Sequence, residues 1–218
     1  MSRRAFHFPP AVFNQRVAVF VDRFYEHMAD LFARQGWQWE EPARTPSRWS
    51  HPEFVVRVAS RFKDKAAHIL EFSMSNLPGV ASLGADGKPR LRHQHRFRVD
   101  IPRSYPANLG SIRVRAMLPL FHPRIGPSGT GVACVYVNGE IDRVLWSIVR
   151  QVLLDPDYVQ PPKLFRGQDR GMNLAAMSWY ETDPVGIHRR LLDLWAEAHG
   201  ATRFTLPAAR RSRVEIEG

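Results

Sequence analysis

The feature that most constrains the fold is a change in hydrophobic period near residue 54. Between residues 13 and 32 the apolar side chains recur at helical spacing, which predicts an amphipathic helix that ends near Gly36. From Phe54 onward, apolar and polar residues alternate. An alternation of period two is typical of a strand with one buried face. The chain is therefore expected to begin as a helix and continue as a sheet.

Four stretches of this alternation succeed one another. Their inward apolar residues are Phe54, Val56, Val58 and Phe62, then Leu70, Phe72 and Met74, then Phe97, Val99 and Ile101, and finally Ile112, Val114, Ala116 and Leu118. Their order along the chain favours an antiparallel meander with one polar face. Arg96, Arg98, Arg113 and Arg115 are expected on that face. Much of the positive charge therefore belongs to the outer surface of the sheet.

Turn-forming residues separate the helix and the strands. The segment 36–52 is broken by proline and rich in aromatic residues, and the segment 79–87 is rich in glycine. Both are expected to be loops. We expect Trp37, Trp39 and Trp49, which belong to the first of these segments, to cover the sheet or the helix from the surface.

Helical spacing returns in the last third of the chain, at residues 141–153, 174–180 and 187–198. The sheet is separated from these helices by LFHPRIGPSGTGVACVYV at residues 120–137. The proline and glycine content of that segment excludes a helix. The order of elements predicts an α+β fold with an N-terminal helix, a four-stranded antiparallel meander, a cysteine-bearing loop and C-terminal helices.

Charge and cysteine content narrow the class of protein. The 218 residues carry a formal net charge of +10 and a single cysteine, Cys134, which excludes an internal disulfide. We find no signal peptide or long apolar span in the sequence, which predicts a protein of the reducing cytoplasm without a membrane partner. The arginines are scattered, apart from the run at residues 209–213, so we do not expect a nucleic-acid partner.

Five short motifs follow one another in the second half of the chain. They are IPRSYP at 101–106, FHPRI at 121–125, the cysteine at 134, VLWSIVRQVLLDPDY at 144–158 and NLAAMSWYETDP at 173–184. Together they resemble the ubiquitin-conjugating enzyme (E2) family. The whole is similar to divergent bacterial E2-like proteins of ubiquitin-like conjugation operons linked to phage defence. The resemblance implies an E2-like domain over residues 11–199, with an N-terminal extension at 1–10 and a basic tail at 200–218.

The resemblance also implies a reaction and its partners. Cys134 would accept a ubiquitin-like protein as a thioester from an E1-type activating enzyme and pass it to an amine of a target protein, without a cofactor. The family uses its first helix to contact the E1 enzyme, and here the polar face of that helix carries Arg16 and Arg23. Small neighbours flank Cys134 and supply no base, so either nearby charge or dipoles must assist the thiol or the incoming thioester must already be activated.

Other residues near these motifs are candidates for supporting roles. The neighbours of His122 are Phe121 and Pro123. They favour a structural role, in which the imidazole fixes the loop through a backbone hydrogen bond, over a role as an acid or base. Asp155 and Asp157 would orient the attacking amine, or they simply end the preceding helix. Arg124 stands where the family has asparagine, and the family's Trp-Ser-Pro segment after the cysteine is missing. An oxyanion donor is therefore sought in Arg124 or Asn138.

Two alternative functions remain on sequence grounds, and two further motifs are set aside. A free cysteine such as Cys134 is often a small buried core residue. If Cys134 is one, the chain is an E2-like binding module without catalytic activity. A cysteine hydrolase using Cys134 and His122 lacks an identifiable acid to orient the histidine. The run GPSGTG lacks the ending of a phosphate-binding loop, and His93 and His95 have no further ligand at metal-binding spacing.

Overall fold

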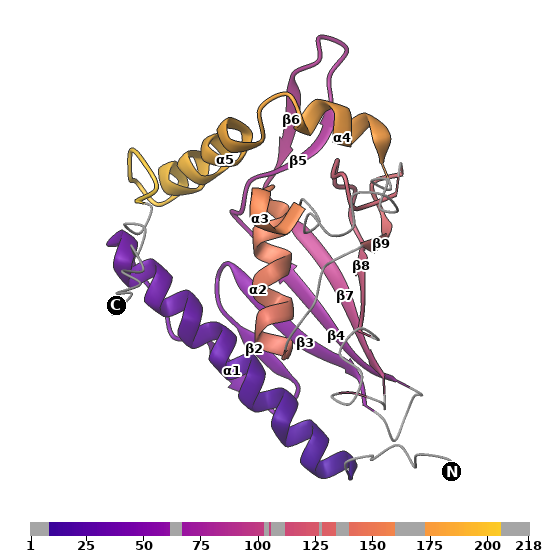
Figure 1. Cartoon of the computed structure of the whole chain (residues 1–218). Helices are drawn as coiled ribbons and strands as arrows, with labels where there is room; N and C mark the ends of the chain where they lie inside the picture. Colours follow the sequence, from indigo (N-terminus) through magenta and orange to yellow (C-terminus); the bar gives the residue numbers. More distant parts are fainter. Residues whose placement is uncertain are drawn as a thin grey trace, which may run out of the picture.

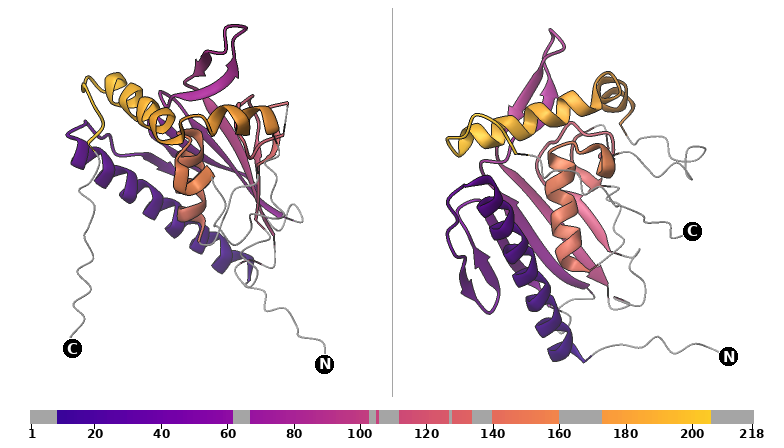
Figure 2. Two further views of the ribbon diagram at one scale, coloured as in Figure 1. Left: turned by 45° about the horizontal axis from the view of Figure 1, so that its top comes forward. Right: turned by 60° about the vertical axis from the view of Figure 1, so that its left-hand side comes forward.

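The computed structural model describes residues 9–61, 67–102, 105, 112–126, 128–133, 140–159 and 173–205. Within these ranges the chain is a mixed α+β protein, with a long N-terminal helix, an antiparallel sheet and C-terminal helices. The helices α1 and α2 lie on one face of the sheet (Figures 1 and 2). The coarse α+β architecture predicted from hydrophobic period is therefore confirmed.

Helix α1 spans Pro10–Gln35 and agrees with the predicted amphipathic segment. Pro10 occupies the first turn, where a missing N–H costs no helical hydrogen bond. Gly36 ends the helix with φ +69°, a left-handed conformation that glycine adopts without strain. The apolar stripe of the helix is buried and consists of Phe13, Val17, Phe20, Val21, Phe24, Tyr25, Met28, Leu31 and Phe32.

The main sheet has the strand order β1-β2-β3-β4-β7-β8-β9, and every neighbouring pair is antiparallel. The strands are β1 (Ala43–Thr45), β2 (Arg48–Ser50), β3 (Phe54–Ser60), β4 (Ala67–Met74), β7 (His95–Pro102), β8 (Arg113–Ala116) and β9 (Gly131–Ala133). Strands β3, β4, β7 and β8 are the four predicted strands. Most of their inward residues are buried as expected, but Val58 is only partly buried, β8 ends at Ala116 before the partly buried Leu118, and Phe62 lies outside the described residues.

Two segments predicted as loops form hairpins instead. Strands β1 and β2 extend the sheet within the segment 36–52, and β5 (Gly79–Leu83) pairs with β6 (Pro89–Arg92) in a separate two-stranded ribbon. The prediction that the tryptophans lie on the surface is also wrong for Trp37 and Trp49, which are 6% and 5% exposed. Trp49 donates its indole N–H to Asp22 Oδ1 of α1 at 2.7 Å, so burial leaves no polar atom unpaired there.

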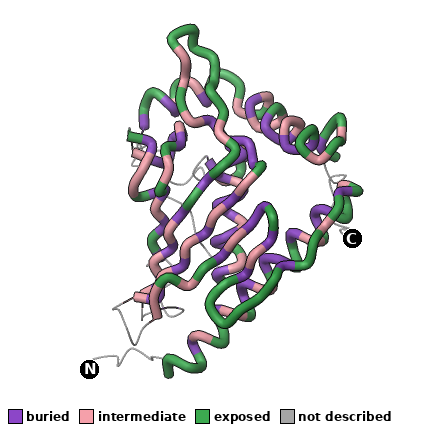
Figure 3. Tube along the Cα trace, turned by 180° about the vertical axis from the view of Figure 1, so that it is seen from behind, coloured by how far each residue is buried: buried purple, intermediate pink, exposed green. Residues whose placement is uncertain are grey.

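Buried and less buried positions alternate along the strands of the sheet (Figure 3). The predicted outer-face arginines, Arg96, Arg98, Arg113 and Arg115, occupy exposed or intermediate positions. The strand register places a row of charged residues side by side across β2, β3, β4, β7 and β8, namely Arg48, Arg57, Glu71, Arg98 and Arg115. Glu71 Oε2 accepts hydrogen bonds from Arg57 at 2.6 Å and from Arg96 at 2.8 Å. The two acids of this face, Glu71 and Asp100, are thus each shared between arginines.

The C-terminal helices are α2 (Ile141–Val152), α3 (Pro156–Val159), α4 (Leu174–Tyr180) and α5 (Pro184–Ala198). Helix α2 packs over the inner face of the sheet beside α1, and most of its residues are buried. Asn173 and Asp183 cap α4 and α5, because their side-chain oxygens accept the N–H groups of Ala176 and Gly186 at 3.0 and 2.9 Å. None of the helices in the described ranges is both long and apolar enough to cross a bilayer.

A pair of hydrogen bonds joins the last residue of α1 to the last described residue of the chain. Gln35 Nε2 donates to the carbonyl of Thr205 at 2.8 Å, and Gln35 Oε1 accepts the N–H of Thr205 at 2.7 Å. Beside this pair, Trp37 stacks on His199 with ring centroids 4.2 Å apart. The C-terminal end of α1 is therefore joined to the segment that follows α5.

Candidate functional site

The segment around His122 is the part of the predicted site that the structure describes most fully. Cys134 and Asn138 lie outside the described residues. Strand β9 ends at Ala133, the residue before the cysteine in the sequence, and Ala133 is 7% exposed. Ala133 pairs with Val114 of β8 and forms an isolated bridge with Ile125. The FHPRI motif is therefore bonded to the strand that leads into the cysteine.

His122 is buried at 1% exposure and turns its imidazole back onto its own loop. Its Nδ1 accepts the backbone N–H of Arg124 at 2.9 Å, which is the kind of contact that the flanking phenylalanine and proline predict. Burial, with a smaller effect of the Arg124 charge, lowers the pKa of His122 to about 3. A base this weak removes protons poorly near neutral pH.

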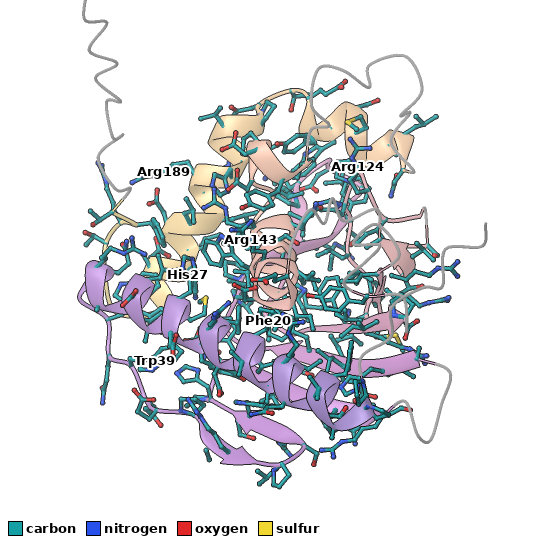
Figure 4. The ribbon with its side chains drawn as sticks, turned by 60° about the horizontal axis from the view of Figure 1, so that its bottom comes forward. Phe20, His27, Trp39, Arg124, Arg143 and Arg189 are labelled. Atoms are coloured by element: carbon teal, nitrogen blue, oxygen red, sulfur yellow. The ribbon has the colours of Figure 1, made fainter. Side chains whose placement is uncertain are left out.

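Arg124 joins the same loop to the helices that follow. Its Nε donates to the carbonyl of Val159, the last residue of α3, at 2.9 Å, and the side chain is 4% exposed. Its neighbour Pro123 accepts the N–H of Asn173, the capping residue of α4, at 3.1 Å. In Figure 4, Arg124 lies toward α4. The loop therefore holds the ends of two helices at once.

The two candidate acids have different environments. Asp155 is 2% exposed, its Oδ1 accepts the N–H of Asp157 at 2.9 Å, and it forms an ion pair with Arg150. His188 Nε2 lies 3.8 Å from the other oxygen of Asp155. Asp155 thus caps the start of α3 and neutralises the guanidinium of Arg150. These contacts give Asp155 a structural role. Asp157 is exposed, so it is the acid of the pair that can meet an incoming amine.

Arg150 and His188 were not among the residues singled out by sequence reasoning. Arg150 lies five positions before Asp155 on the buried side of α2, and His188 comes from α5, 33 positions after Asp155. No spacing signal connects them, because they meet only where α5 packs near the end of α2.

Arg16 and Arg23, the predicted E1 contacts, are both exposed on α1. They line a shallow depression with Phe20 and Glu140. The guanidinium of Arg23 lies 5.4 Å from the ring centre of Phe20, and Arg23 Nη1 is 3.4 Å from Glu140 Oε2. Val19, which is 45% exposed, adds an apolar side chain to this surface. Both arginines are therefore accessible to a partner, and Arg23 also forms an ion pair with Glu140.

His93, which precedes β7, and His95, its first residue, do not form a metal site with the residues that the structure describes. His95 is buried, and its Nε2 lies 2.9 Å from the carbonyl of Leu77 and 3.1 Å from that of Arg92. Burial lowers the pKa of His95 to about 4. In the described ranges, no group of three or more His, Cys, Asp or Glu side chains is arranged to hold a metal ion.

Neither protein-family models nor curated protein sequences match this chain. The likeness to conjugating enzymes therefore depends on the sequence motifs, on their order and on the α+β arrangement described above.

Proposed function

We propose that the protein is an E2-like carrier that accepts a ubiquitin-like protein on Cys134 from an E1-type enzyme and transfers it to an amine of a target, in the cytoplasm. The observation that carries the proposal is the bridge between Ile125 of the FHPRI motif and Ala133. It joins one of the five motifs to the residue that precedes the cysteine in the sequence. A loop bonded to the strand before the cysteine, and to two following helices, is a rigid support for a reactive group.

The chemistry consists of two acyl transfers. In the first, the Cys134 thiolate attacks the carbonyl carbon of the E1 thioester, a new C–S bond forms, and the E1 thiolate leaves. In the second, a neutral target amine attacks the same carbon, an amide forms, the Cys134 thiolate leaves, and the one proton that the nitrogen loses passes to water. Asp157 is the exposed acid that we assign to orienting the amine, and His122 and Arg124 hold the loop.

Two of the alternatives differ from this proposal in what they require of His122 and Cys134. A cysteine hydrolase needs a histidine that takes the proton of the thiol, and an imidazole that is buried and has a pKa of about 3 is unsuited to that role. An idle binding module needs no thioester at all. Formation of a covalent adduct on Cys134 distinguishes the E2-like carrier from the idle binding module.

The test is a charging reaction with a cognate E1-type enzyme, ATP and the ubiquitin-like protein, followed on a nonreducing gel. The wild type is expected to form an adduct that thiol removes. Cys134→Ser should give a thiol-resistant oxyester or no adduct, and Cys134→Ala should give none. Thermal melts of each variant provide the control. A wild type that never charges, together with a Cys134→Ala variant that melts many degrees lower, would establish a core cysteine and an idle module.

A further inference from the structure

A cavity of about 510 Å³ lies among α1, α2, α5 and the segment that follows α5. Cavities that bind small molecules in proteins have volumes of about 300–1,000 Å³. The walls are mostly apolar and include Leu31 of α1, Trp146 of α2, Leu192 and Trp195 of α5, and Phe204. The cavity is separate from the loop at His122, which contributes no residue to its lining.

The titratable side chains of the cavity are basic, namely Arg34 and His27 from α1, Arg150 from α2 and His188 from α5. Gln35 and Thr205 add neutral polar groups that bond to each other, and none of the described residues that line the cavity is acidic. Burial lowers the pKa values of His27 and His188. The two arginines therefore supply the fixed positive charge at neutral pH.

The two arginines differ in how far their charge is already neutralised. Arg150 is paired with Asp155, and its guanidinium lies 5.5 Å from the ring centre of Trp146 and 5.2 Å from that of Tyr158. Arg34 is exposed, and its Nε donates to the backbone carbonyl of Asp30 at 3.1 Å. Among the described residues, Arg34 has no ion pair with a carboxylate. Arg34 is thus the group at the rim that an anion can neutralise.

We propose that this cavity binds a small organic acid whose apolar body fills the space between the helices and whose anionic group meets Arg34. Apolar walls with one convergent cation favour such a ligand over a neutral hydrocarbon, which leaves the cation unpaired, and over a cation, which Arg34 repels. The inference does not depend on Cys134 or on any transfer reaction.

The first measurement uses decanoate and a fluorescent aromatic acid, anilinonaphthalene sulfonate, with the full chain. The sulfonate is expected to bind at one site with enhanced emission and to quench tryptophan fluorescence, because Trp146 and Trp195 line the cavity. Decanoate should displace it, while decanol and decyltrimethylammonium should compete at least about tenfold less well, since a hydrogen bond to a charged group contributes about that factor. Equal competition by the three head groups would refute the assignment.

Two variants place the binding in this cavity. Arg34→Glu reverses the rim charge on an exposed position and should weaken decanoate binding by about tenfold or more. Arg143→Glu is the matched control, because Arg143 is exposed on α2 and does not line the cavity. Leu192→Trp should block binding by filling the space, and its thermal melt reports whether it folds. If Arg34→Glu and Arg143→Glu bind decanoate equally, the ligand lies elsewhere and the proposal fails whatever Leu192→Trp does.

Discussion

Arg124 Nε donates a hydrogen bond to the backbone carbonyl of Val159 at 2.9 Å, across 35 positions of sequence. The bond is buried, and it ties the loop of the FHPRI motif to α3. The bond adds to the backbone hydrogen bonds that the loop makes at Leu120, Phe121 and Ile125. The orientation of this loop is therefore determined in part by a side chain and by the end of a helix that is only four residues long.

Removing this contact is expected to destabilise the protein. In Arg124→Ala the carbonyl of Val159 keeps its burial and loses its donor, which costs about 1–3 kcal/mol in the free energy of unfolding. Arg143→Ala, at an exposed position of α2, should change the free energy by less than about 0.5 kcal/mol. Urea unfolding of the two variants measures the difference. Equal stability of both variants would show that the bond contributes nothing.

Acid is expected to weaken the fold through its buried histidines. Burial lowers the pKa of His122 to about 3 and the pKa values of His68 and His95 to about 4, from 6.5. The folded protein therefore binds fewer protons than the unfolded chain below about pH 6.5, so the stability contributed by each group is complete above that pH and decreases as the pH falls toward its folded pKa. Each histidine should remove about 1.4 kcal/mol per pH unit in this window.

The measurement is urea unfolding at a series of pH values. His122→Asn should reduce the slope of the free energy of unfolding against pH by the equivalent of about one proton, since one group no longer titrates. His93→Asn serves as the control, because His93 is exposed on the loop before β7. A slope that is the same in the wild type and in His122→Asn contradicts a buried, neutral His122.

Alanine substitutions at Gly79 and Gly126 test how the β5–β6 hairpin packs against α2. A Cβ at Gly79 would lie 2.7 Å from His95 Cε1 and 2.9 Å from Val152 Cγ1, whereas a Cβ at Gly126 would meet its nearest atom at 4.0 Å. Gly79→Ala should therefore cost about 1–3 kcal/mol by overpacking. Gly126→Ala should be close to neutral. Thermal melts compare them, and a neutral Gly79→Ala would mean that the hairpin is not held as described.

Charge reversal on α1 tests the proposed E1 contact. Arg16→Glu/Arg23→Glu should slow charging of Cys134 by about tenfold at low salt and less at high salt, because rim charges act mainly through the association rate. Arg48→Glu/Arg113→Glu makes the same change in charge on the opposite, outer face of the sheet and should leave the rate unchanged. If both double variants charge at the same rate, α1 is not the docking surface. Charging of the wild type is a precondition, and its failure counts against the proposed function instead.

Duplex DNA is expected to bind weakly despite the net charge of +10. The arginines of the outer face share Glu71 and Asp100, so part of their charge is already compensated. Nonspecific affinity of this kind corresponds to a Kd of about 10⁻⁴–10⁻⁶ M at physiological salt and decreases steeply as salt rises. Fluorescence anisotropy with a labelled duplex at two salt concentrations gives the slope. Tight, sequence-selective binding at physiological salt would overturn this expectation.

The sequence predicted elements wherever periodicity extends over enough residues. Helix α1 and the strands β3, β4, β7 and β8 alternate clearly between buried and exposed positions, and all were found. Strands β1, β2 and β9 have three residues each, which is too short for a periodic signal. They exist because a neighbouring strand offers unpaired backbone groups and because Trp49 packs against α1.

The candidate site was less predictable than the fold for a related reason. The backbone contact of His122 is local, within two residues, and its neighbours indicated it. The group of Arg150, Asp155 and His188 depends on how α5 lies against α2 and the turn after it, and residue spacing carries no information about that. The same holds for the bond from Arg124 to Val159. Contacts between distant segments are determined by packing, which a single sequence does not display.

The hydrogen bonds between Gln35 and Thr205 have a consequence for how the chain is synthesised. They join residues 170 positions apart, so the ribosome needs roughly ten to thirty seconds between making the first partner and the second. During that time Phe32 and Trp37 lack the cover that Trp195 and His199 later provide. The nascent helix therefore presents an aromatic surface to chaperones until the last segment emerges, and chains that terminate before residue 195 are expected to aggregate rather than to fold.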